Sequence, residues 1–329
     1  MTEVLILGGT GWLSGRVAQR WIDAGASVTS LARGSRPAPE GAVLVAADRE
    51  DPSAYDAVRM REWDEVVDVS SRPPHVRSAV RALGDRAAHW TYISSVSVYA
   101  EADVVGADES AALAPPADTR ESEEEYPRAK AACEAAVRAA LEDRAAIVRP
   151  GLVVGPGDPT DRFGYWVGRF ALAEDGPVLV PDAPHARAQV IDVDDLADFV
   201  VAMGRERWAG SVTAAGDSVP LVDVLRLAAL VGGHTGDVVR ADESWLTTQD
   251  VSPWAGPSSL PLWLPAELTG FATRSNALYR RLGGRLRPLH ETLERVLADE
   301  RDRGLDRSRG AGLTRAEERA LLARLAATE

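Results

Sequence analysis

The chain has 329 residues, which at roughly 150 residues per domain allows two domains or one large domain with an appended lobe. Its hydrophobic content of 45% and charged content of 26% are ordinary for a globular protein with a packed core. The formal net charge of −13 argues against a nucleic-acid partner, because such a surface repels polyanions.

A glycine cluster follows the first predicted strand. Four apolar residues at 4–7 run into it, and residues 17–22 beyond it have the spacing of a helix. Such a turn leaves backbone N–H groups pointing outward at the positive end of the helix dipole, and glycine lets an anion approach them. The alternatives are an ordinary strand, turn and helix, or a cradle for the pyrophosphate of a dinucleotide. The cradle residues would be Gly8, Thr10, Gly11, Trp12 and Leu13.

The spacing of this motif departs from the usual one at its third position. Gly8 and Gly11 are followed by Ser14, and Gly15 comes one place late. The third glycine normally lets the helix pack closely against the strand, and serine is small enough to take that place.

Residues 27–32 form the second predicted strand and complete a βαβ unit. An acidic residue past this strand would bind a free ribose hydroxyl, whereas arginine accommodates a 2′-phosphate. The chain has Arg33, Ser35 and Arg36 there. This favours NADP over NAD, unless these are solvated loop arginines.

Further strands are predicted at 43–46 and 65–69. The first is followed by Asp48 and Arg49, where an adenine could lie, and the second by Ser70, a further candidate contact for the cofactor. A helix then opens at Pro73, since proline is tolerated in the first turn. Strands that alternate with helices in this way predict an α/β fold with a doubly wound parallel sheet.

The fifth strand is predicted at 90–95 and continues through 96–99. Ligands bind at the carboxyl ends of such strands, so the hydroxyls of Ser94 and Ser95 are well placed for chemistry. Side chains alternate along a strand, so both cannot face one ligand. The alternative is that these two serines only make the end of the strand polar and have no role in catalysis.

Residues 101–125 are acidic, and the run Glu123, Glu124 and Glu125 is interpreted as solvated surface rather than a metal site. An alanine-rich helix then begins at Tyr126. Lys130 lies four residues later on the same face. Tyr-x-x-x-Lys is common by itself and often an exposed pair.

Together, the glycine turn, the hydroxyl after strand five and Tyr-x-x-x-Lys resemble the extended branch of the short-chain dehydrogenase/reductase superfamily, the NAD-dependent epimerase/dehydratase family. The resemblance runs from residue 4 to about residue 196. It implies a Rossmann-type doubly wound parallel sheet, a smaller and mostly helical C-terminal substrate lobe, and NADP or NAD as cofactor. In the family's Ser-Ser-x-x-Val-Tyr pattern the second serine is catalytic, which implies Ser95. Tyr126 and Lys130 match the acid/base pair.

Hydride exchange at a carbinol carbon needs a proton relay at the oxygen. Tyr126 would serve as acid/base, with a pKa lowered by the ammonium of Lys130 and by the nicotinamide charge. Lys130 would also hold the nicotinamide ribose, and Ser95 would orient the substrate oxygen.

Departures from the family pattern narrow the range of reactions that the resemblance implies. Family dehydratases place Asp-Glu after the catalytic hydroxyl, where this chain has Val96 and Ser97, which disfavours dehydration. Residues 149–158 resemble the Arg-Pro-x-x-Val-x-Gly-Pro-Gly-Asp run of reductase-like members. The asparagine that sugar-nucleotide epimerases carry near Leu152 is absent, and Arg187 lies one position from the usual arginine. An NAD(P)-dependent dehydrogenase or reductase is therefore preferred, with a sugar or nucleotide-sugar epimerase second and a non-catalytic, regulatory NAD(P)-binding relative third.

We expect an NAD(P)-binding domain at 1–155, its sheet completed by a strand near 188–193, and a substrate lobe with a helical tail at 156–329. Residues 158–169 are rich in aromatic and charged side chains, which line the substrate pocket or pack between the lobes. The candidate substrate residues are Ser97, Arg162, Phe163, Tyr165, Trp166 and Arg187.

Later elements follow from local patterns. Asp194 is expected to cap a helix through residue 201. Helices are predicted at 221–230, 243–248, 276–282 and 289–302. Thr314 with Glu317 forms a capping box for a final helix, which runs to about residue 326. The proline-punctuated aromatic stretch at 252–265 either covers an apolar substrate or ties the tail to the body.

The remaining expectations concern partners. One cysteine, Cys133, excludes an intramolecular disulfide and a thiolate metal cluster, and the five histidines lack metal-ligand spacing, so no metal is expected. The chain opens on a strand without signal-peptide features, and no apolar run reaches membrane-spanning length. We expect a cytoplasmic monomer or homodimer that acts on a small molecule, with no membrane partner.

Overall fold

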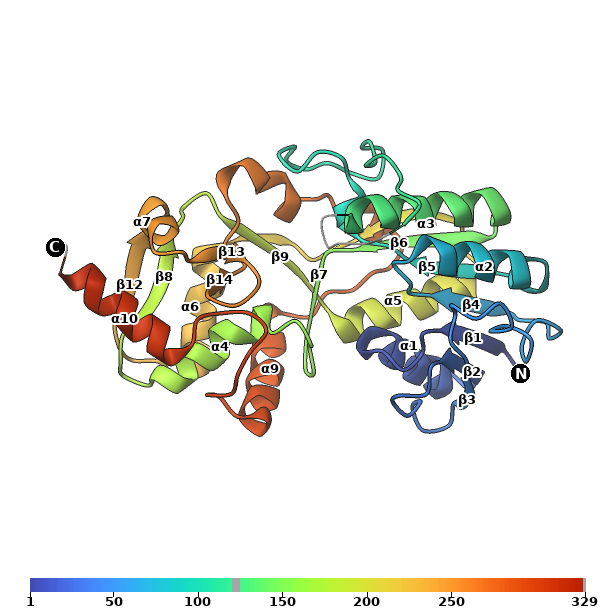
Figure 1. Ribbon diagram of the computed structural model, residues 1–329, viewed down its shortest axis with the longest axis horizontal. Coiled ribbons are helices and arrows are strands. Elements are labelled where there is room, and N and C mark those ends of the chain that lie inside the picture. Colours follow the sequence, from blue (N-terminus) through green and yellow to red (C-terminus); the bar gives the residue numbers. More distant parts are fainter. Residues whose placement is uncertain (120–124, 328–329) are drawn as a thin grey trace.

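Seven parallel strands form the sheet of the first of two lobes (Figure 1). In spatial order they are β10 (Gly210–Ala214), β6 (Ala145–Pro150), β5 (Trp90–Ile93), β4 (Glu65–Asp68), β1 (Glu3–Leu7), β2 (Ser27–Ala32) and β3 (Val43–Ala46). The computed structural model describes residues 1–119 and 125–327. The strand order reverses between β1 and β4, so the predicted Rossmann-type doubly wound sheet is confirmed.

Helices cover both faces of this sheet (Figure 1). The helices α1 (Trp12–Asp23) and α5 (Val193–Glu206) lie on one face, and α2 (Pro73–Leu83) with its 3-10 extension η1 (Gly84–Arg86) and α3 (Tyr126–Leu141) lie on the other. Strands β1, β4, β5 and β6 are almost entirely buried between them, and the apolar run at 4–7 in β1 is typical of a strand covered on both faces.

Strand β9 (Arg187–Asp192) is not part of the large sheet, contrary to the prediction. It pairs in parallel with β7 (Leu152–Val154) and antiparallel with β11 (Ser218–Pro220), and the edge strand of the large sheet is β10 instead. The chain therefore returns to the first lobe after residue 155, with α5, β10 and α8 (Ala277–Arg281). The ring of Tyr279 in α8 packs 4.6 Å from that of Phe199 in α5.

The cap of α5 is Asp192 rather than Asp194. Its Oδ1 accepts a hydrogen bond from the Asp194 amide at 2.9 Å, and its Oδ2 accepts one from Thr292 Oγ1 at 2.9 Å. Asp194 pairs with Arg295 in the first turn instead. Within the described ranges, no group of three or more histidine, cysteine, aspartate or glutamate side chains is arranged to hold a metal ion.

The second lobe is mostly helical, with two small parallel sheets. Its helices are α4 (Arg162–Ala173), α6 (Leu221–Gly232), α7 (Glu243–Thr248), η3 (Ala266–Ala272), α9 (Leu289–Arg303) and α10 (Arg315–Ala326). The sheets pair β8 (Val178–Asp182) with β12 (Val238–Asp242) and β13 (Ser252–Trp254) with β14 (Ser259–Pro261). The predicted capping box of α10 is present, since Thr314 Oγ1 and Glu317 bond each other's backbone amides at 3.2 and 2.7 Å.

Two further observations bear on the predictions. No helix in the described part of the chain is both long and apolar enough to cross a membrane. Strand β5 ends at Ile93, and the residues expected to continue it form the 3-10 helix η2 (Val96–Val98). Glu123 and Glu124 of the acidic loop lie outside the described residues.

Candidate active site

The glycine turn between β1 and α1 has the backbone shape that its sequence predicts. Gly8 has a φ of +87°, and its amide donates to the Leu31 carbonyl at 2.8 Å, which fixes the turn against β2. A side chain on Gly9 would lie 2.5 Å from Ser30 Oγ, so only glycine fits there. The turn thus delivers the N-terminus of α1 to the carboxyl edge of the sheet.

Ser14 accounts for the unusual spacing of the motif. Its Oγ donates to the Gly8 carbonyl at 2.6 Å and accepts from the Gly11 amide at 3.1 Å, and its side chain is buried. A glycine at this place leaves room for close packing, whereas this serine closes the turn from within. Trp12 and Leu13 are the first two residues of α1, where backbone N–H groups have no intrahelical acceptor.

A cleft of about 450 Å³ opens on one side of the turn. The ends of β2 and β3 line it with the predicted Arg33, Ser35, Arg36, Asp48 and Arg49, and Gly8, Thr10, Gly11 and Ser70 line it from the other strands. Arg33 and Arg36 are exposed at its rim. Within residues 1–119 and 125–327, neither guanidinium has a hydrogen-bond or ion-pair partner.

Arg49 is committed to the protein rather than to a ligand. Its Nη1 and Nη2 donate to the two oxygens of the Asp68 carboxylate at 2.8 and 2.7 Å, and its Nε donates to Tyr55 at 2.9 Å. Burial opposes its charge, but the Asp68 carboxylate outweighs burial and raises the pKa of Arg49. Asp48 accepts from the Glu50 amide at 3.1 Å and remains on the cleft wall.

A second cleft of about 570 Å³ meets the first at Gly11 and Val69. It is lined by Ser95, Tyr126 and Lys130, so the three residues that the resemblance implies as catalytic converge on one cavity. Ser97, a candidate substrate residue, lines it as well. The two clefts together run along the carboxyl edge of the sheet, across the point where the strand order reverses.

Lys130 is buried beneath this second cleft. Its Nζ donates to the carbonyls of Ile93 at 2.6 Å and Ser70 at 3.1 Å, at the ends of β5 and β4, and lies 4.8 Å from the centre of the Tyr92 ring. These contacts fix the ammonium one helical turn from Tyr126, the first residue of α3.

Ser95 is half-buried just after the end of β5 and caps η2. Its Oγ accepts from the Ser97 amide at 3.1 Å and donates to Ser97 Oγ at 3.1 Å. The hydroxyl is therefore oriented by the turn that follows the strand.

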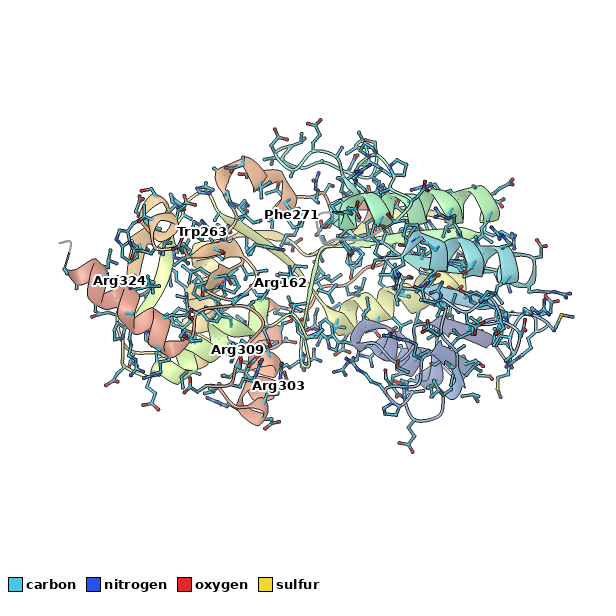
Figure 2. The ribbon with its side chains drawn as sticks, viewed as in Figure 1. Arg162, Trp263, Phe271, Arg303, Arg309 and Arg324 are labelled. Atoms are coloured by element: carbon cyan, nitrogen blue, oxygen red, sulfur yellow. The ribbon has the colours of Figure 1, made fainter. Side chains whose placement is uncertain are left out.

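The second lobe supplies the opposite wall. Arg162, Trp254 and Phe271 line the cleft, and the rings of Trp254 and Phe271 meet edge to face at 5.4 Å. Figure 2 shows Arg162 and Phe271 at the boundary between the two lobes. Trp12 links the two sides, since its Nε1 donates to the Pro156 carbonyl at 2.9 Å. Sequence reasoning missed Trp254 and Phe271 as individual residues; the aromatic stretch at 252–265 was the signal for the first.

Three aromatic candidates lie elsewhere. Phe163, Tyr165 and Trp166 point into the core of the second lobe, each at most 1% exposed. Trp166 Nε1 donates to the Pro261 carbonyl at 2.7 Å, which ties α4 to β14. Of the candidates on this helix, only Arg162 lines the cleft, because the apolar side chains of an amphipathic helix turn toward its core.

Arg187 also lies away from the cleft. Its Nε and Nη2 donate to the hydroxyl and the carbonyl of Ser218, both at 2.8 Å, which stabilises the pairing of β9 with β11. Although Arg187 lies near the usual family arginine in sequence, it does not line the cleft.

Comparison with known proteins agrees with this geometry. Residues 75–214 match the sequence model of the NAD dependent epimerase/dehydratase family. The resemblance inferred from the motifs is thus confirmed over that segment. No curated protein sequence matches the chain.

Solved structures share the fold over most of their length. A protein from Burkholderia cenocepacia, provisionally called an epimerase, has a TM-score of 0.71 at 23% identity, over 92% of this chain and 98% of that one. UDP-N-acetylglucosamine 4-epimerase from Bacillus cereus has 0.69 at 14% identity, over 95% and 100%. UDP-glucose 4-epimerase from Thermus thermophilus, solved as a complex with NAD, has 0.65 at 16% identity, over 91% and 99%.

Proposed function

We propose that this chain, which carries a segment of the NAD dependent epimerase/dehydratase family, is an NAD(P)-dependent oxidoreductase. It exchanges a hydride between nicotinamide and a carbonyl or alcohol carbon of a small molecule. The observation that carries the proposal is the convergence of Ser95, Tyr126 and Lys130 on one cleft that continues into the cleft at the glycine turn.

The residues around the two clefts fit a dinucleotide. Gly8, Thr10 and Gly11 line the first cleft, and the first amides of α1 suit a pyrophosphate. Bound there, NAD(P) supplies the hydride acceptor or donor. Arg33 and Arg36, exposed and without partners in the described part of the chain, suit a ribose 2′-phosphate, which supports the preference for NADP.

Each of the three residues has a defined task. Tyr126 moves the proton at the substrate oxygen, because it lines the cleft one helical turn before Lys130. Lys130, fixed by the carbonyls of Ile93 and Ser70, holds positive charge beside the phenol and favours its ionised form. Ser95 donates to the substrate oxygen after exchanging its bond to Ser97.

The proposal is tested by cofactor binding and by a substrate screen. Tryptophan fluorescence is titrated with NADPH and NADH, since Trp12 and Trp254 line the second cleft. A panel of ketones, aldehydes and alcohols is then followed by cofactor absorbance. We expect tighter binding of NADPH and net oxidation or reduction; binding of neither cofactor would overturn the proposal.

A second candidate is an NAD-dependent epimerase for a sugar or a nucleotide sugar. The observation that favours it is the fold shared with UDP-sugar 4-epimerases over more than 90% of each chain. An epimerase returns its hydride to the same substrate and therefore retains its cofactor. NAD that copurifies, survives dialysis and supports no net turnover would place this candidate first.

A further inference from the structure

Arg162 presents its charge to the second cleft in a fixed orientation. It is the first residue of α4, its Nε donates to Thr160 Oγ1 at 3.3 Å, and its guanidinium carbon lies 4.8 Å from the centre of the Trp254 ring. Thr160 is held in turn by Asp158, which accepts from its amide at 2.8 Å and its hydroxyl at 3.0 Å. Thr160 occupies Nε, and the Trp254 ring lies near the guanidinium carbon. The two Nη nitrogens are therefore the part of the guanidinium that can bind a ligand.

Arg162 forms no ion pair with a carboxylate in the described part of the chain, although the charge of Asp158 acts on it from nearby. Asp161, the preceding residue, accepts instead from Arg303 at 3.0 Å, from Arg307, and from the Gly310 amide at 2.9 Å. In the described ranges no ion pair includes Arg162, and neither of its Nη nitrogens has a hydrogen-bond acceptor. The α4 dipole also opposes a cation at this end of the helix.

The surroundings of Arg162 make this lack of an anion costly. Burial lowers its pKa, while the carboxylate of Asp158 and the phenol of Tyr126 act in the opposite direction. A guanidinium stays protonated under these conditions, so the cost remains until a negative group enters the cleft. Arg162 and Tyr126 line the same cleft, so the guanidinium shares the cavity of the proposed proton relay.

We propose that Arg162 binds an anionic group of the substrate, a carboxylate or a phosphate, through paired hydrogen bonds from its two Nη nitrogens. The inference rests on the proposed function, because it assigns the substrate of that site to compounds that carry negative charge near the reacting carbon. Trp254 and Phe271 would then pack against the apolar part of the same molecule.

Binding measurements test this without relying on turnover. The protein loaded with NADP⁺, which cannot reduce a ketone, is titrated calorimetrically with pyruvate, acetoacetate and phenylpyruvate and with the matching primary amides, which differ in charge but little in size. Inorganic phosphate and UDP form a second arm, which separates a carboxylate from a phosphate as the source of the anion. We expect at least one anion to bind about 10- to 100-fold more tightly than its neutral match, with weaker binding at high salt.

Variants identify the residue responsible. Arg162→Gln should abolish the preference for the anion, and Arg162→Lys should retain part of it, since lysine keeps the charge but lacks the planar fork. Arg226→Gln, on the exposed side of α6, is the matched control and should bind as the wild type does. Thermal unfolding verifies that each variant is folded.

Two results would overturn the inference. One is equal binding of every anion and its neutral match to the wild type, and the other is an anion preference that survives in Arg162→Gln. Failure of the proposed function has a different signature, because turnover would be absent in the wild type while Arg162→Gln still lost anion binding. The two proposals can therefore fail separately.

Discussion

Replacing Ser14 by glycine restores the family spacing in the sequence, and we expect it to weaken the protein. The change removes two hydrogen bonds. Ser14 Oγ donates one to the Gly8 carbonyl at 2.6 Å and accepts the other from the Gly11 amide at 3.1 Å. Each is worth about 1 kcal/mol net. Glycine for serine within α1 costs roughly a further 0.5 kcal/mol, which gives a loss of about 2–3 kcal/mol in the free energy of unfolding.

Thermal unfolding measures this loss. With about 2–4 °C of midpoint change per kcal/mol in a large domain, Ser14→Gly should unfold roughly 4–12 °C below the wild type. Ser14→Ala removes the same bonds but retains a good helix former, so it should lose less. The dissociation constant for NADPH should rise in both variants, because the turn that presents the amides of Trp12 and Leu13 is no longer closed by the serine.

The control is Gly15→Ala, one residue later. An added methyl group there would lie 3.9 Å from the nearest atom, Pro39 Cγ, so the helix can accept it without strain. If Ser14→Gly were as stable as the wild type, or if Gly15→Ala destroyed cofactor binding, then Gly15 and not Ser14 would occupy the third position of the motif. The reasoning from the serine hydrogen bonds would then be wrong.

Three further predictions follow from the clefts and the core. Tyr126→Phe should lower kcat about 10²- to 10⁴-fold and leave cofactor affinity nearly unchanged. The control is Tyr165→Phe, which loses a hydroxyl buried in the second lobe and should retain activity. Unaltered turnover in Tyr126→Phe would refute the assignment of Tyr126 as the acid/base. Arg33→Ala should raise KM for NADPH about 10-fold and leave KM for NADH unchanged; a parallel rise in both would argue against a 2′-phosphate contact. Burial disfavours charge on His89, but the Glu65 carboxylate, 2.5 Å from its Nδ1, outweighs this and raises the pKa of His89. The pair therefore stabilises the fold below about pH 6.5, the ordinary pKa of histidine, and loses this contribution as the pH rises through the raised folded-state pKa. The difference in unfolding midpoint between wild type and Glu65→Gln should therefore narrow as the pH rises above about 6.5, and a constant difference would contradict the linkage.

The first lobe was largely predictable because its signals are local. The apolar runs, the glycine turn and the alanine-rich helix each predict an element from fewer than twenty neighbouring residues. Ser95, Tyr126 and Lys130 follow strand ends or open a helix, so parallel topology alone brings them to one edge of the sheet. The choice of β10 rather than β9 as the strand beside β6 was not predictable, since both are short and the pairing joins segments that lie far apart in the chain.

The walls of the cleft depend on contacts between distant parts of the chain. Phe163 and Trp166 were expected there, and the face of α4 that packs on α6 and α9 turns both into the core instead. Trp254 and Phe271 reach the cleft from residues far beyond the catalytic motif, in segments with no regular period. Arg49 looks like a ligand contact in sequence, and only its pairing with Asp68, 19 residues later, shows that it is already occupied.

The two lobes contribute different kinds of residue to the cleft. Every group that would move a proton or hold the cofactor lies in the first lobe, and hydride exchange at a carbinol carbon is the same step in a reductase and in an epimerase. Arg162, Trp254 and Phe271 line the cleft from the second lobe, so on the proposed function they would select the molecule that is held and determine whether it can rotate between two hydride transfers. The hydrogen bond from Trp12 Nε1 to the Pro156 carbonyl joins the start of α1 to the segment that leads into α4. Changes at Arg162 or Trp254 should therefore alter KM and substrate preference, whereas changes at Tyr126 alter kcat for every substrate.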